Sequence, residues 1–143
     1  MIYITGDTHG MIDFGYIKEY FAAHYSTPKD ILFILGDVAP VWSKDDSSIS
    51  DYDLLGPTII YIDGNHENFE LLNSFPLVNK FGAKMHMLSG NLYHVLRGEI
   101  AEINGLSFLC LGGATSIDKD RRIDRVSWWN EENITYSDID NAL

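Results

Sequence analysis

Five side chains that can bind metal ions or transfer protons follow three short apolar runs. Asp7 and His9 come after the first run, Asp37 after the second, and Asn65 and His66 after the third. Carboxylate oxygens and imidazole nitrogens together suit Mn, Fe or Zn better than Ca or Mg. The two oxygens of Asp37 would also allow it to bridge two cations. This pattern predicts a site for divalent cations.

Each of these residues has an ordinary structural explanation as well. Asp7 and Asp37 are of a type that forms turns after strands. Asn65 could cap a helix, and His66 could lie in an exposed loop. Because all five occupy matching positions after three similar runs, chance is a poor explanation of the set. We therefore favour the functional interpretation.

The apolar runs predict parallel strands. Residues 2–7, 31–37 and 59–65 are apolar on both faces and end in Gly-Asp or Gly-Asn, which is typical of buried parallel strands. Strands that alternate with helices predict an α/β fold, in which ligands bind beyond the carboxyl ends of the strands. The connection between the first two runs has the spacing of an amphipathic helix, at Ile17, Tyr20, Phe21 and His24.

The rest of the chain is predicted to be richer in strands. We expect a short helix within residues 68–75 and a strand over residues 91–96. Asn104-Gly105 is a strong hairpin signal, so residues 99–103 and 106–112 are predicted to pair.

Two other segments are predicted from composition and capping signals. The acidic, serine-rich residues 44–53 are expected to form an exposed loop. Ser137 fits the pattern that opens a helix, with Tyr136 before it as a hydrophobic staple. The sequence stops at Leu143, less than two turns later, so we expect the fold to be incomplete at its C-terminus.

The composition is typical of one globular domain, which we expect to span residues 1–143. Hydrophobic residues make up 45% of the chain and charged residues 22%. No apolar run approaches the roughly 20 residues that cross a bilayer, and the N-terminus lacks a secretory signal. The single cysteine, Cys110, lies in an apolar run and is expected to be buried. These features predict a cytoplasmic protein that does not bind membranes.

The charge of the chain argues against general binding of nucleic acid. The net charge is −11, whereas a duplex-binding surface needs a basic face that displaces counterions. Arg121, Arg122 and Arg125 form a small basic cluster. Arg121 is our candidate for contacting a substrate phosphate, with ordinary surface charge as the alternative for the cluster.

The sequence resembles the calcineurin-like metallophosphoesterases. Asp7-Thr8-His9, Gly36-Asp37 and Gly64-Asn65-His66-Glu67 are similar to the first three motifs of that family, D-x-H, GD and GNH followed by an acidic residue. Gly112-Gly113-Ala114 and Ser127-Trp128-Trp129 also resemble segments of its bacterial and phage members. The resemblance implies a β-sandwich flanked by helices, with a metal pair at the strand ends.

The resemblance also implies a role for each residue of the site. Asp7 and His9 would hold the first cation, Asp37 would bridge both, and Asn65 would hold the second. His66 would contact the substrate, as would Asn65, and would act as a general acid oriented by Asp37. The reaction implied is hydrolysis of a phosphomonoester or phosphodiester by a water that two cations activate. Mn is the expected metal, with Fe, Zn and Mg as alternatives.

The sequence departs from the family pattern after these motifs. Family members continue to further metal-binding histidines, including a G-H-x-H motif, that have no match here. His24, His86 and His94 lie in other contexts and are expected to be structural. The second cation would be left with few ligands, so we expect its site to be weak. Missing strands would also leave an open sheet edge, which favours a homo-oligomer.

Two functional hypotheses follow. The first is a metal-dependent phosphoester hydrolase, impaired if the chain is truncated. The second is a catalytically dead protein that uses the phosphoesterase scaffold to bind a partner, such as a phage factor that engages a host protein.

Overall fold

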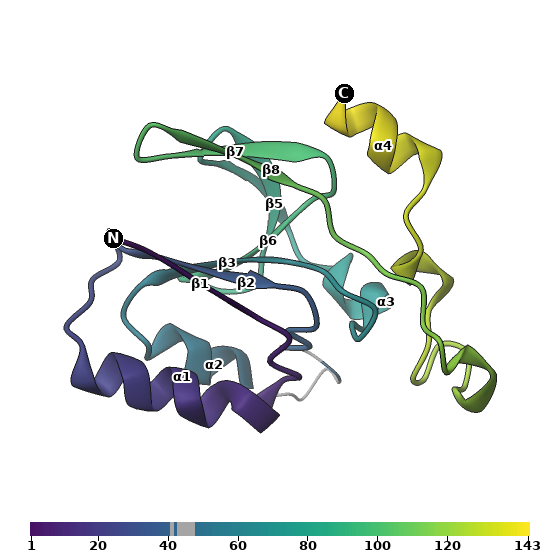
Figure 1. The fold of residues 1–143 in the computed structure, drawn as a ribbon, viewed down its shortest axis with the longest axis horizontal. Coiled ribbons are helices and arrows are strands. Elements are labelled where there is room, and N and C mark those ends of the chain that lie inside the picture. The colour runs from purple at the N-terminus through teal and green to yellow at the C-terminus, as the bar shows by residue number, and fades with distance from the viewer. Residues whose placement is uncertain (41, 43–47) are drawn as a thin grey trace.

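The main element of the structure is a mixed sheet of six strands with a two-stranded sheet above it (Figure 1). The computed structural model describes residues 1–40, 42 and 48–143. The strand order in the large sheet is β1 (Ile2–Gly6), β2 (Ile31–Leu35), β3 (Thr58–Ile62), β6 (Leu92–Val95), β5 (Ala83–Met87) and β4 (Leu77–Lys80). The first four of these run parallel, and β5 and β4 are antiparallel to their neighbours. The small sheet pairs β7 (Glu99–Ile103) with β8 (Leu106–Cys110).

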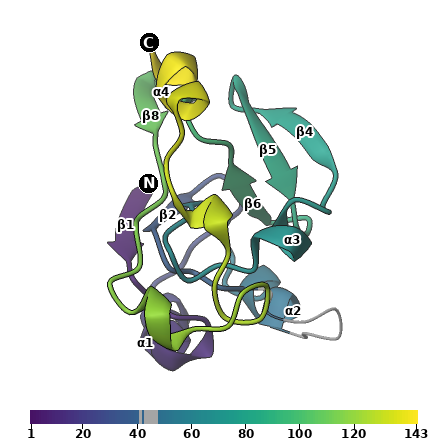
Figure 2. The same ribbon diagram turned by 90° about the vertical axis from the view of Figure 1, so that its right-hand side faces the viewer.

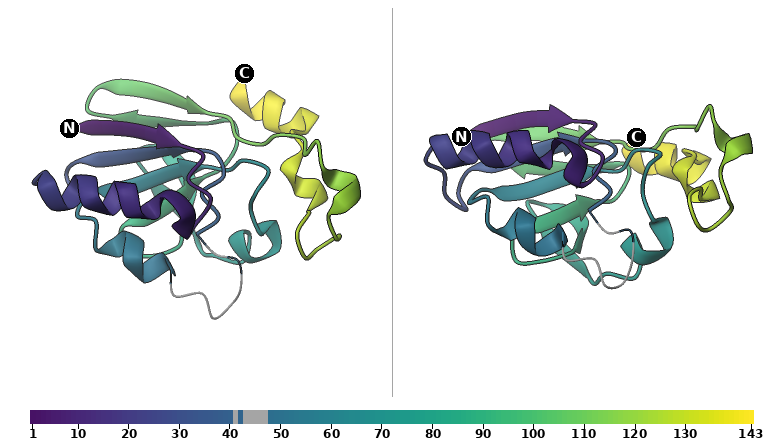
Figure 3. Two further views of the ribbon diagram at one scale, coloured as in Figure 1. Left: turned by 60° about the horizontal axis from the view of Figure 1, so that its bottom comes forward. Right: turned by 90° about the horizontal axis from the view of Figure 1, so that it is seen from below.

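Helices cover one face of the large sheet, and the small sheet covers the other (Figures 1 and 3). Helices α1 (Met11–Ala23) and α2 (Ser48–Asp53) lie on the first face. Helix α3 (Phe69–Leu72) follows β3, and α4 (Tyr136–Ala142) ends the chain. Two short 3₁₀ turns lie between them, η1 (Lys119–Arg121) and η2 (Asn130–Glu132). This arrangement confirms the predicted α/β architecture of sheets flanked by helices.

Side chains along β2 alternate between the two faces of the large sheet, and a separate hydrophobic core lies on each face. Leu32 and Ile34 point toward the helices and pack in a cluster with Phe14 of α1. Phe33 points the other way, where its ring lies 4.8 Å from that of Phe108 in β8. Central strands buried on both faces explain why the sequence reads as an unbroken apolar run.

The expectation that the first run is buried on both faces is wrong. Strand β1 is at the edge of the large sheet and pairs only with β2. Ile4 is 61% exposed, although its partner across the ladder, Phe33, is buried. The apolar pattern predicted the strand correctly, but neighbouring elements decide how far each face is covered.

Several local predictions are confirmed, because turn and cap residues act over short distances. Asn104 and Gly105 have φ values of 53° and 79° and join β7 to β8 as a hairpin. The side chain of Asn68 accepts a hydrogen bond from the backbone N–H of Leu71 and caps α3. Cys110 is buried, with 3% of its surface exposed.

Two local predictions need correction. Residues 48–53 form helix α2 instead of a loop, and Tyr52 anchors that helix in the core; residues 44–47 of the predicted loop lie outside the described residues. Helix α4 begins at Tyr136, and its cap is Thr135, which exchanges hydrogen bonds with Asp138 in a capping box. Ser137 therefore lies inside the helix, because the capping box between Thr135 and Asp138 starts the helix two residues earlier than predicted.

None of the described helices is long and apolar enough to cross a bilayer.

Candidate metal centre

The loops after β1, β2 and β3 lie side by side at one end of the large sheet. The ladder pairs Gly6 with Leu35 and Leu35 with Ile62, so the three strands end at the same level. Beyond that point the backbone N–H of Asp7 donates to the carbonyl of Gly36, at 3.1 Å. The carboxyl ends of these parallel strands therefore bring their loops together, as the sequence predicted.

The backbone of these loops adopts uncommon conformations. Asp7, His9, Asp37 and Ala39 have φ values of 58°, 46°, 50° and 42°. Non-glycine residues rarely adopt positive φ, and each costs about 1–3 kcal/mol unless neighbouring structure holds it. The N–H of His9 donates to the carbonyl of Asp37 at 2.7 Å, which ties two of these positions together. Such clustered strain is typical of a functional site.

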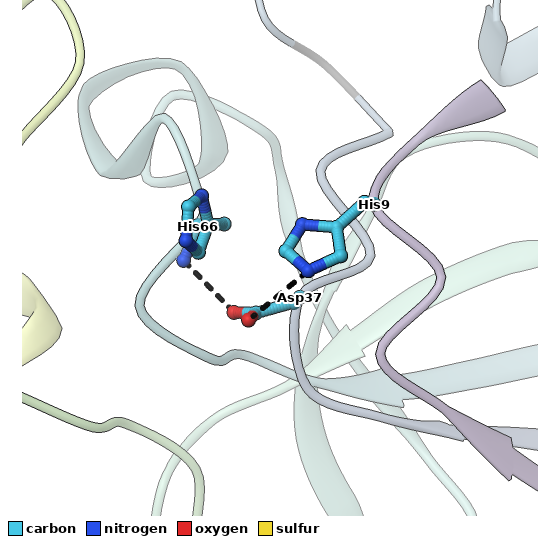
Figure 4. Close-up of side chains that lie close together, drawn as sticks. All are labelled: His9, Asp37 and His66. Atoms are coloured by element: carbon cyan, nitrogen blue, oxygen red, sulfur yellow. Dashed lines mark hydrogen bonds and ion pairs between the residues drawn. The ribbon is translucent and has the colours of Figure 1, made fainter. Parts of the chain in front are cut away.

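His9, Asp37 and His66 converge on one point (Figure 4). The Nε2 atom of His9 lies 2.8 Å from Asp7 Oδ1 and 3.9 Å from Asp37 Oδ2. The backbone N–H of His66 donates to Asp37 Oδ1 at 2.9 Å. The ring centroids of His9 and His66 are 4.7 Å apart, and the two rings meet edge to face. One potential ligand atom from each of His9, Asp37 and His66 lies within 4.8 Å of the others.

Gly64 allows the loop after β3 to approach Asp37. A Cβ atom added at Gly64 would lie 2.0 Å from Asp37 Oδ1 and 2.5 Å from the Asp37 backbone nitrogen. Neither distance is tolerable for a carbon atom. The glycine of the third motif is therefore required by close packing against the carboxylate.

Glu67 joins the loop after β3 to the loop after β2. Its two carboxylate oxygens accept hydrogen bonds from the backbone N–H groups of Val38 and Ala39, at 2.9 and 3.0 Å. Burial, followed by the charge of Asp63, raises the pKa of Glu67 well above its usual range. The sequence motif gives Glu67 no role of its own, whereas in the structure Glu67 holds the strained loop that carries Asp37.

Asn65 is held by the segment that follows β8. Its amide nitrogen donates to the hydroxyl of Ser116 at 3.1 Å, and Ser116 in turn contacts the buried carboxylate of Glu132. A pocket of about 400 Å³ is lined by Asp7, Asp37 and Asn65 and by residues of this segment, including Gly112 and Ala114. Figure 3 shows the segment, drawn in green to yellow, beyond the ends of the strands, and Figure 2 shows it from that side, in front of the large sheet. Nothing local in the sequence marks Ser116 or Glu132, so neither residue was predicted.

Arg122 of the basic cluster contacts the site. Its Nη2 atom lies 2.7 Å from His66 Nε2, and its Nε atom lies 2.8 Å from Asp118 Oδ1. Burial and then the charge of Arg122 lower the pKa of His66. The side chain of Arg121, our sequence candidate, is exposed, and Arg125 lies 3.8 Å from Glu70.

The other histidines lie elsewhere in the fold. His24 ends helix α1, where its ring stacks on Tyr20. His86 and His94 are buried on β5 and β6 with their Nδ1 atoms 3.1 Å apart. His94 Nε2 lies 3.1 Å from Asp63 Oδ1, and the Nε atom of Arg97 donates to the other carboxylate oxygen of Asp63, Oδ2, at 2.9 Å. These contacts form a buried polar network.

The potential metal ligands in the loops after β1, β2 and β3 fit a divalent cation. Imidazole nitrogens and carboxylate oxygens from separate strand-end loops meet beside an open pocket, and this mixture of ligands suits transition metals. Fold and site together define an α/β protein with a candidate metal centre at the carboxyl ends of its parallel strands.

Comparison with known families identifies the chain more closely. Residues 1–142 match the calcineurin-like phosphoesterases, so the chain belongs to that family. Searches of curated proteins and of solved structures returned no match. Membership suggests metal-dependent hydrolysis of phosphoesters, and it covers almost the whole chain.

Proposed function

We propose that this protein is a metal-dependent phosphoester hydrolase with its active site at the rim formed by the loops after β1, β2 and β3. The observation that supports the proposal most directly is the convergence of His9, Asp37 and His66 within 4.8 Å. In this proposal Asp7 and His9 would hold one cation, Asn65 would hold the second, and Asp37 would contribute to both. A bound cation pair, for which we favour Mn, would activate water for attack and neutralise charge on the phosphoryl oxygens.

The protein's own groups would orient the substrate. Arg122 carries a guanidinium that Asp118 holds against His66, and a planar guanidinium suits bidentate binding of phosphate oxygens. We therefore assign phosphate binding to Arg122 in preference to Arg121, because Arg122 is the member of the cluster whose side chain reaches the site.

His66 would contact the phosphate and then protonate the leaving group. An arginine only donates hydrogen bonds, so Nε2 of His66 accepts the bond from Arg122 and carries no proton in this arrangement. Donation from Nε2 therefore requires Arg122 to transfer its hydrogen bond to the substrate phosphate. Substrate binding and the availability of the acid would then be coupled.

Turnover measurements test the proposal. Purified protein is assayed with p-nitrophenyl phosphate and bis-p-nitrophenyl phosphate in the presence of Mn. We expect turnover that the His66→Ala variant lowers by about 10²–10⁴-fold, the usual contribution of a general acid. His24→Ala is the matched control, since His24 lies at the exposed end of α1. Wild-type turnover no higher than that of His66→Ala would refute the assignment and favour a scaffold that binds a partner.

A further inference from the structure

Glu132 is an unusual buried charge that the proposed reaction does not use. None of its surface is exposed, and burying a carboxylate is costly unless hydrogen bonds compensate. Both of its oxygens bind the same residue. Oε1 accepts a bond from the backbone N–H of Ser116 at 2.7 Å, and Oε2 accepts one from the Ser116 hydroxyl at 2.6 Å.

These bonds determine how Ser116 can interact with Asn65. A serine hydroxyl has one proton, and Ser116 uses that proton to donate a hydrogen bond to Glu132. Its oxygen can therefore only accept a hydrogen bond from Asn65, and the amide nitrogen of Asn65 donates to it at 3.1 Å. The NH₂ end of the amide is thus held at Ser116, and the carbonyl oxygen is the end left for a cation.

We propose that Ser116 and Glu132 are positioning residues that orient the amide of Asn65 for metal binding. This inference rests on the proposed function, in which Asn65 is a ligand. A cation binds the carbonyl oxygen of an amide and is repelled by its N–H groups. An amide rotated by half a turn would present the wrong group. The acceptor-only carboxylate of Glu132 therefore selects one of two amide orientations that have nearly the same shape.

The backbone around the two residues is anchored well enough to support this role. The N–H of Ala114 donates to the carbonyl of Glu132 at 3.0 Å, and the N–H of Gly113 donates to the carbonyl of Asp63 at 2.9 Å. The guanidinium of Arg97 also donates to the carbonyl of Glu132, at 3.3 Å, and forms an ion pair with Asp63. Ser116 and Glu132 are thereby fixed relative to the loop that carries Asn65.

Glu132→Gln tests the proposal without changing the size of the side chain. The new amide can keep the bond from the Ser116 backbone while its NH₂ group donates to the Ser116 hydroxyl. The Ser116 hydroxyl would then donate its hydrogen bond to the carbonyl oxygen of Asn65, which favours the rotated Asn65 amide. We expect Mn binding, measured by calorimetry, to weaken by about 10–100-fold, as is usual when a partner of a metal ligand is changed. Glu131→Gln is the matched control, because the neighbouring side chain is exposed; its affinity should match that of the wild type.

Substitutions at Ser116 separate orientation from charge. Ser116→Ala removes the acceptor for Asn65 without changing the net charge, and it should also weaken Mn binding. Ser116→Thr keeps the hydroxyl and should restore most of the affinity. Thermal melting without metal shows whether each variant is folded.

A measurement without metal distinguishes failure of this proposal from failure of the proposed function. In NMR spectra of the wild type, the side-chain NH₂ protons of Asn65 should show contacts to the β protons of Ser116, and Glu132→Gln should lose them. Unchanged contacts, or unchanged Mn affinity in folded Glu132→Gln protein, would overturn the positioning role. Wild-type protein that binds no Mn would instead overturn the proposed function, while the NMR comparison would still decide whether the two residues orient Asn65.

Discussion

Replacing Gly64 with alanine should disrupt the candidate metal centre through a single methyl group. The added Cβ would lie 2.0 Å from Asp37 Oδ1, whereas ordinary contacts begin at 3.4 Å. The carboxylate would have to move by roughly 1.4 Å, the difference between these contact distances, and so leave the position it holds in the loop. Rotation of the Asp37 side chain alone cannot relieve the clash, because the Asp37 backbone nitrogen is also only 2.5 Å away.

The cost of Gly64→Ala can be estimated from the contacts it breaks. Overpacking costs about 1–3 kcal/mol. Displacing Asp37 Oδ1 leaves the backbone N–H of His66 without its acceptor, which costs about 1–3 kcal/mol more. We therefore expect the free energy of unfolding to fall by about 2–6 kcal/mol. At about 3 °C per kcal/mol for a chain of this size, Tm falls by roughly 6–18 °C.

Thermal and urea unfolding measure the loss of stability, and Mn titration measures the effect on the site. A displacement near 1 Å in a reacting group can cost on the order of 100-fold in rate, so turnover should fall even at temperatures where the variant is folded. Gly15→Ala is the matched control. It lies inside α1 with no atom near the added Cβ, and alanine there should stabilise the helix by about 0.5–1 kcal/mol. A Gly64→Ala protein with the Tm and Mn affinity of the wild type would refute the packing argument.

Two other predictions concern Arg122 and the buried histidine pair. Arg122→Gln should raise KM for p-nitrophenyl phosphate by about 10-fold or more, since hydrogen bonds to charged groups contribute about 1.5–3 kcal/mol. The control Arg121→Gln should leave KM unchanged. Equal effects of the two variants in steady-state assays would contradict phosphate binding by Arg122. Burial and then the charge of His94 lower the pKa of His86 to about 4 from 6.5. Because the folded protein binds this proton more weakly than the unfolded chain, stability from His86 is present above pH 6.5 and is lost as the pH falls toward 4. Urea unfolding at pH 7 and pH 4.5 should show a smaller loss for His86→Gln than for the wild type, and an equal loss would show that other groups dominate.

The sequence alone determined the parts of the site that depend on local chemistry. The apolar runs that end in Gly-Asp or Gly-Asn predicted β1, β2 and β3. In β2 and β3 the apolar run follows from burial on both faces of the sheet. Parallel strands share one carboxyl edge, so the runs also predicted that Asp7, Asp37 and Asn65 would lie near one another. The short cap and hairpin signals at Asn68 and Asn104 succeeded for the same reason, since each acts within a few residues.

Only the tertiary structure decided which distant side chains complete the site. Asn65 and Ser116 are 51 residues apart, and His66 and Arg122 are 56 apart. Contacts at such separations depend on the path of the segment after β8, which no periodicity or cap signal encodes. The exposure of Ile4 was likewise decided by the neighbours that β1 has in the sheet. Residue types and spacing specify candidate ligands and strands locally, whereas their partners are decided by packing between segments far apart in the chain.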